Sequence, residues 1–170
     1  DGEIVRNMMR ETTDLDTLPI PDFSLFDPNR FYKPMKGKLM RMGSVETHRG
    51  CPYKCAFCNS PGQVRLYKRA NAGEFFRLKK VEHVRRELLN LRDNFHVEYV
   101  YFPADTFLAM PDAHMYEFAE MYQEFKLPFW CQTRPETLTP ERVRMLQQMG
   151  CRDMSLGIEH GNEQFRKTVV

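Results

Sequence analysis

The sequence contains 170 residues, which is enough for one domain with a sizeable core and too short for two large domains. Hydrophobic residues make up 42% and charged residues 28% of the chain, a composition typical of globular rather than disordered proteins. The formal net charge is only +2, so the charge balance requires neither nucleic acid nor an anionic membrane as a partner.

The chain begins with a stretch that has no sustained hydrophobic period. From residue 1 to about residue 36 no helix or strand pattern emerges, and Pro19 and Pro21 exclude a helix interior. Phe23, Phe26 and Phe31 are too many apolar rings for a free tail, so we expect this arm to lie against the folded body. We therefore assign an irregular arm or linker to residues 1–43 and the core to residues 44–170, with a first strand within 38–47.

Three cysteines follow this strand within eight residues, at Cys51, Cys55 and Cys58. No apolar run is long enough to span a bilayer and no secretory signal is recognisable, so we expect a cytoplasmic protein with no membrane partner. There, clustered thiols more often bind metal or do redox chemistry than form disulfides. A structural zinc site needs four ligands, and only His48 lies close enough to complete a set. A four-iron cluster suits the count better, because three thiolates leave one iron open for a small chelating ligand.

The rest of the chain alternates between predicted helices and strands. Pro61-Gly62 marks a turn, and we expect the basic stretch from there to about Lys79 to be a solvated loop. The elements predicted after it are a helix at 81–94, a strand at 97–102, a helix from about 111, a strand at 129–133, a helix at 140–149, a strand at 153–158 and a helix from about 162. His83 lies off the apolar stripe of its helix and is expected at the surface, whereas Cys131 and Cys151 are expected to be buried structural thiols.

This order of elements predicts a parallel sheet with right-handed crossovers. In such α/β folds, ligands collect at the carboxyl ends of the strands. The cysteine loop, Asp105, Arg134 and Glu159 all come just after a predicted strand, so we expect them to share one site. His160 stands beside Glu159 as a candidate proton carrier, but we assign it no role.

The segment from His48 to Cys58, HRGCPYKCAFC, resembles the cluster-binding loop of the radical S-adenosylmethionine enzymes, including the aromatic residue immediately before the third cysteine. The resemblance implies a partial parallel (β/α) barrel over about residues 44–170, its first four β/α units, with the remaining units missing from a truncated core. It also implies that Cys51, Cys55 and Cys58 hold a [4Fe-4S] cluster. One electron from such a cluster cleaves S-adenosylmethionine to methionine and a 5′-deoxyadenosyl radical, which acts on a substrate that the sequence does not identify.

The same resemblance implies roles for four further residues. Phe57 would lie near the adenine, Glu159 would accept hydrogen bonds from the ribose hydroxyls, and Arg134 would pair with the carboxylate of S-adenosylmethionine. Asp105, two residues before Phe107, would contact the methionine end, because this element replaces the glycine-rich turn of many members and is found in cobalamin-linked members. The arm is similar to the linker that follows a cobalamin-binding domain, and these residues contain no such domain. The implied protein partner is an electron donor such as flavodoxin or ferredoxin.

The alternative is a non-enzymatic zinc module. His48 and the three cysteines would supply four ligands, and the basic stretch with Tyr67, Phe75 and Phe76 would contact RNA. Polar residues at the neighbouring strand ends argue against this alternative, because a structural zinc site needs no such neighbours, so nucleic acid is not an expected partner. An incomplete barrel also exposes a sheet edge and leaves the site open to water, which argues against full activity of the chain alone.

Overall fold

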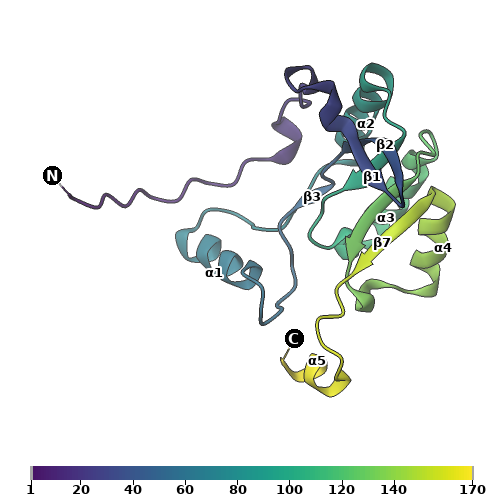
Figure 1. The fold of residues 1–170 in the computed structure, drawn as a ribbon. Coiled ribbons are helices and arrows are strands. Elements are labelled where there is room, and N and C mark those ends of the chain that lie inside the picture. The colour runs from purple at the N-terminus through teal and green to yellow at the C-terminus, as the bar shows by residue number, and fades with distance from the viewer. Residues whose placement is uncertain (1, 170) are drawn as a thin grey trace.

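The fold is built around a five-stranded sheet in the computed structural model, which describes residues 2–169 (Figure 1). The strand order is β1-β2-β5-β6-β7; β1 runs antiparallel to β2, and the other neighbours are parallel. The sheet strands are β1 (Tyr32–Met35), β2 (Lys38–Ser44), β5 (Tyr99–Phe102), β6 (Phe129–Thr133) and β7 (Cys151–Leu156), and a second, two-stranded sheet pairs β3 (His48–Arg49) with β4 (Arg77–Leu78). The helices are α1 (Ser60–Ala70), α2 (Val81–Phe95), α3 (Asp112–Tyr122), α4 (Pro140–Met149) and α5 (Glu163–Val169). This curled, mostly parallel half-barrel confirms the predicted α/β fold class.

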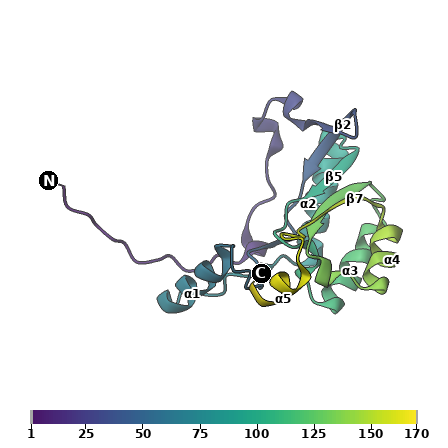
Figure 2. The ribbon, with the colours of Figure 1, turned by 60° about the horizontal axis from the view of Figure 1, so that its bottom comes forward.

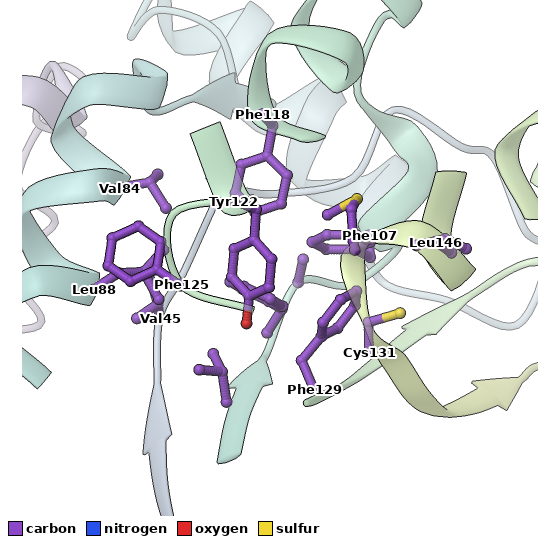
Figure 3. Close-up of a cluster of buried hydrophobic side chains, with 14 of the residues drawn as sticks. Val45, Val84, Leu88, Phe107, Phe118, Tyr122, Phe125, Phe129, Cys131 and Leu146 are labelled. Carbon is purple, nitrogen blue, oxygen red and sulfur yellow. The ribbon is translucent and has the colours of Figure 1, made fainter. Parts of the chain in front are cut away.

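Helices α2, α3 and α4 cover one face of the sheet and bury its apolar side chains (Figure 3). Val100, Phe102, Phe129 and Cys131 are fully buried on this face. Because successive side chains of a strand point to opposite faces, the residues that alternate with them, including Tyr101 and Trp130, point away from the helices. Tyr101 and Trp130 therefore lie on the opposite, concave face of the sheet.

Several predicted elements are confirmed by the structure. Strand β6 has the predicted bounds, α2 extends one residue beyond its predicted end, and β7 begins two residues before its predicted start. Helix α4 begins where expected because the Thr139 side chain accepts a hydrogen bond from the Arg142 amide and Pro140 occupies the first turn. It ends where Gly150 adopts a left-handed conformation, with φ of 90°.

Three predictions from the sequence are wrong. No strand was expected before about residue 36, but β1 lies there and pairs antiparallel with β2. The basic stretch expected to be a loop contains α1, with Pro61 in its first turn and Asn71 in a left-handed conformation after its last turn. His83, expected at the surface, is buried, because Glu87 one turn further along α2 is itself buried with Lys79. The Lys79 Nζ lies 2.6 Å from the Glu87 carboxylate, so α2 turns a polar group inward to meet this charge.

The arm contacts the body at particular points rather than along its whole length. Leu15 and Phe31 are buried, and Phe31 stacks on Phe95 of α2. By contrast, almost all side chains in residues 2–11 are exposed, and this stretch extends away from the sheet in Figure 1. None of the helices described is long and apolar enough to cross a membrane.

Candidate active site

A cleft of about 670 Å³ lies at the carboxyl ends of the strands, at the end of the molecule where Figure 2 shows α1 and α5. Its lining includes all seven residues that the sequence predicts to share a site: Cys51, Cys55, Cys58, Phe57, Asp105, Arg134 and Glu159. They come from the loop after β3 and from the segments that follow β5, β6 and β7. The topology thus brings together residues separated by more than a hundred positions in the chain.

The segment that ends in β4 packs against the start of the cysteine loop. His48 pairs with Leu78 and Arg49 with Arg77 in the short antiparallel sheet. Gly50, immediately before the first cysteine, has a φ of +83°, and a Cβ built there would lie 2.4 Å from the Phe75 carbonyl oxygen. Only glycine combines this backbone conformation with so close an approach.

The three thiols differ in exposure and contacts. Cys51 is buried and its Sγ lies 3.7 Å from the Thr106 Oγ1, whereas Cys55 is half-buried and Cys58 is exposed. The Ser60 amide donates to the Cys58 Sγ at 3.4 Å. None of the three is in a disulfide. Three free thiols around one cleft, with amide and hydroxyl donors beside them, are a donor set suited to a [4Fe-4S] cluster.

Arg134 extends from the end of β6 to the cysteine loop. Its guanidinium lies over the Tyr53 ring at 4.7 Å from the ring centroid, and its Nη1 donates to the Cys55 Sγ. Its Nε donates to the Glu136 carboxylate at 3.2 Å. The Nη2 group has no hydrogen-bond partner among the described residues, so one edge of the guanidinium is available to an anionic ligand in the cleft.

The acidic residues of the cleft are exposed at its rim. Glu159 has a left-handed backbone, with φ of +65°, and a Cβ at Gly157 would lie 2.4 Å from the Glu159 Oε1. The absence of a side chain at Gly157 therefore makes room for this carboxylate. Asp105 is exposed beside buried Thr106, and the Phe57 ring is 60% exposed.

His48 does not join the cysteines in a metal site. It is buried, its ring packs against Phe76, and its Nδ1 lies 3.1 Å from the Thr47 Oγ1. Burial lowers the pKa of His48 to about 4. Among residues 2–169 no group of three or more His, Cys, Asp or Glu side chains is placed to hold a single metal ion. A single zinc ion would require such convergence, whereas the ligands of a four-iron cluster are spread around it.

Sequence reasoning missed other residues of the cleft, including Thr106, Gln132, Ser155 and Gly157. A signal for one of them was present in the alternation of strand residues. Gln132 in β6 stands two residues before the predicted site residue Arg134, so both are expected on the same side of the sheet. The contact between Tyr53 and Arg134 had no comparable signal.

The other thiols and His160 lie outside the cleft lining. Cys131 is fully buried among the helix-facing side chains, and interaction with the Cys151 thiol, together with burial, raises its pKa. His160 is exposed and packs against Phe165 of α5, while its Nδ1 accepts a hydrogen bond from the Asn162 amide. Cys131 therefore faces the core and not the mouth of the sheet.

A parallel half-barrel with a thiol-lined cleft at its strand ends defines an α/β enzyme of the barrel type. The chain belongs to the radical SAM superfamily, whose family model matches residues 45–169. Enzymes of this superfamily use a [4Fe-4S] cluster and S-adenosylmethionine, and the donor set described above suits that cluster. The resemblance noted in the cysteine loop thus extends over most of the chain.

The relatives found are methyltransferases. An uncharacterised methyltransferase of Pyrococcus horikoshii, PH0819, is 27% identical over 146 residues, which span 85% of this chain and 29% of that protein. The radical S-adenosylmethionine methyltransferase TsrM of Kitasatospora setae, with cobalamin and a [4Fe-4S] cluster bound, has the same fold, with a TM-score of 0.55 and 18% identity over 74% of this chain and 24% of TsrM. A second structure of TsrM, with tryptophan substrate and a SAM analogue, has a TM-score of 0.54 at 18% identity over 73% of this chain and 23% of TsrM. The chain spans less than a third of the length of these relatives.

Proposed function

We propose that this chain is the cofactor-binding core of a cobalamin-linked radical SAM methyltransferase. In this proposal Cys51, Cys55 and Cys58 are the three protein ligands of a [4Fe-4S] cluster, which supplies one electron for the reductive cleavage of S-adenosylmethionine. The observation that carries the proposal is the single cleft lined by all three cysteines and by the polar residues of three strand ends. The methyltransferase relatives support methyl transfer as the reaction class. The cobalamin bound to TsrM supports cobalamin as the second cofactor, and in this proposal a domain outside residues 1–170 would bind it.

The remaining site residues would bind and orient S-adenosylmethionine. The free edge of the Arg134 guanidinium suits its carboxylate, and the Glu159 carboxylate offers several acceptor positions for the two ribose hydroxyls. The exposed ring of Phe57 would stack near the adenine, and Asp105 would contact the methionine amino group. An external donor such as flavodoxin or ferredoxin would reduce the cluster.

The zinc-module alternative is not favoured. His48 is committed to packing against Phe76 on the buried side of the loop, and the described residues offer no converging set of ligands. The family match, which covers the cysteine loop, further supports an enzyme core over a zinc module.

The test is anaerobic reconstitution, followed by measurement of iron and acid-labile sulfide and by electron paramagnetic resonance of the reduced protein. We expect about four irons per chain and a [4Fe-4S]+ signal that changes when S-adenosylmethionine is added. Alanine at Cys51, Cys55 or Cys58 should abolish the cleavage of S-adenosylmethionine. Cys151→Ala, outside the cleft, is the matched control and should retain it. Stoichiometric zinc in place of iron, or full cleavage by a variant lacking one of the three cysteines, would contradict the proposal.

A further inference from the structure

A stacked pair of aromatic rings lies on the concave face of the sheet, on the side that none of the helices within residues 2–169 covers. Tyr101 of β5 and Trp130 of β6 are register partners, and their rings stack with centroids 4.4 Å apart and planes at 18°. Both side chains are only half-buried, in contrast to the fully buried Val100, Phe102, Phe129 and Cys131 on the helix-facing side of the same strands. The pair therefore presents aromatic surface that the described part of the chain leaves uncovered.

The pair lies directly beneath the cofactor cleft. Gln132 and Ser155, which line the cleft, stand one row further along β6 and β7 on the same face, about 6 to 7 Å along the strand from the row of Trp130. The Trp130 indole N–H donates to the Ser155 Oγ at 3.1 Å, so a residue of the cleft fixes the orientation of the ring. Burial and the charge of Asp105, another cleft residue, raise the pKa of Tyr101. The aromatic pair thus adjoins the cleft through Ser155.

The neighbouring groups are polar but carry little net charge. Ser44 is the register partner of Tyr101, and Asp153 is the register partner of Trp130. Asp153 is already engaged, since it accepts a hydrogen bond from the Tyr99 hydroxyl at 2.8 Å and pairs with Lys36. The two rings stack on each other, so each offers its outer face and its edges, and an amide and hydroxyls lie beside them. This surface suits a flat, uncharged ring with polar edges better than an ion.

We propose that the Tyr101–Trp130 pair is the subsite for a planar aromatic or heteroaromatic ring of the substrate, held below the cofactor cleft. This proposal rests on the proposed function and adds the substrate class to it. The substrate ring would stack on an outer face of this pair, and Gln132 and Ser155 would offer hydrogen bonds to its edge.

The test measures binding of a flat and a puckered probe to the reconstituted protein by saturation-transfer difference NMR. Benzamide and cyclohexanecarboxamide are both neutral and of similar size, and only benzamide has a planar ring. We expect benzamide to bind at least about five-fold more tightly, with or without S-adenosylmethionine. Equal binding of the two probes would overturn the proposal. Loss of benzamide binding on adding S-adenosylmethionine or hydroxocobalamin would assign the pair to a cofactor ring and would also overturn it.

Variants locate the binding to the pair. Trp130→Leu should weaken benzamide binding about ten-fold, and Trp130→Phe, which keeps a ring, should retain it within about three-fold. Tyr116→Leu, which removes an exposed ring on α3, is the matched control and should change nothing. If Trp130→Leu fails to fold, Tyr101→Leu should give a loss of about five-fold. Unchanged binding in either folded leucine variant would refute the subsite.

The change in the cluster signal on adding S-adenosylmethionine separates this inference from the proposed function. It should persist in Trp130→Leu, because the leucine removes ring binding and leaves the cysteine loop intact. Absence of that change in the unmodified protein would instead count against the proposed function.

Discussion

Gly50→Ala should destabilise the protein and displace the cysteine loop. Alanine at a φ of +83° costs about 1 kcal/mol, because its Cβ crowds the backbone in the left-handed region. The new Cβ would also lie 2.4 Å from the Phe75 carbonyl oxygen, and reaching an ordinary contact of 3.4 Å requires a movement of about 1 Å. Because that oxygen belongs to backbone leading into β4, overpacking adds about 2 kcal/mol. We expect a total loss of about 3 kcal/mol in the free energy of unfolding.

Gly37→Ala is the matched control for this substitution. Gly37 has a similar φ of +77°, but a Cβ there meets nothing within 4 Å, so only the cost of about 1 kcal/mol for the conformation applies. Urea unfolding of the two variants gives the difference, and iron content after reconstitution shows whether the loop still assembles. Gly50→Ala should bind less iron and Gly37→Ala should bind as much as the unmodified chain. Equal stability and equal iron in the two variants would refute the steric reasoning.

Two further predictions concern buried charge. Lys79→Met removes the cation that pairs with the buried Glu87 carboxylate and should lower the free energy of unfolding by about 3 to 5 kcal/mol. Adding Glu87→Gln should recover part of this loss. No measurable loss of stability in urea unfolding of Lys79→Met would contradict the prediction. His48 has a pKa of about 4 when folded against 6.5 when unfolded, so the unfolded chain takes up the proton first as pH falls. Stability should therefore fall by about 3 kcal/mol from above pH 6.5 to below pH 4. His48→Gln should lose this component of the pH dependence, and exposed His160→Gln should keep it; equal profiles for these variants would contradict the assignment.

The elements that the sequence predicted well are those with local signals. Strand β6 lies between Pro128 and Pro135, and α4 has a cap at Thr139 and a left-handed Gly150, so their ends are set by residues inside or beside them. The missed strands β1, β3 and β4 are two to four residues long and are defined only by their pairing partners. Helix α1 was missed because its many basic residues and the Pro61-Gly62 pair in its first turn are also typical of a loop.

The candidate site was predictable to the extent that strand ends determine it. In a parallel sheet the carboxyl ends meet at one edge, so Asp105, Arg134 and Glu159 were expected together from the order of elements alone. The stacking of Arg134 on Tyr53 could not be predicted, because it depends on the path of the cysteine loop. The burial of His83 was missed for a related reason, since its buried neighbour Glu87 pairs with Lys79, which lies outside the helix.

The support of the cysteine loop extends beyond the residues that the family model matches. The Thr12 amide donates to the Ala72 carbonyl at 2.8 Å, and the Arg77 Nη1 donates to the Thr13 carbonyl at 2.6 Å. The Lys80 amide donates to the Asp16 carboxylate at 2.8 Å, at the other end of β4. These contacts tie the arm to the segment from residue 72 to residue 80, and Phe75 in that segment is the residue against which Gly50 packs. The arm therefore supports the segment that packs behind the cysteine loop, although it contributes no residue to the lining of the cleft.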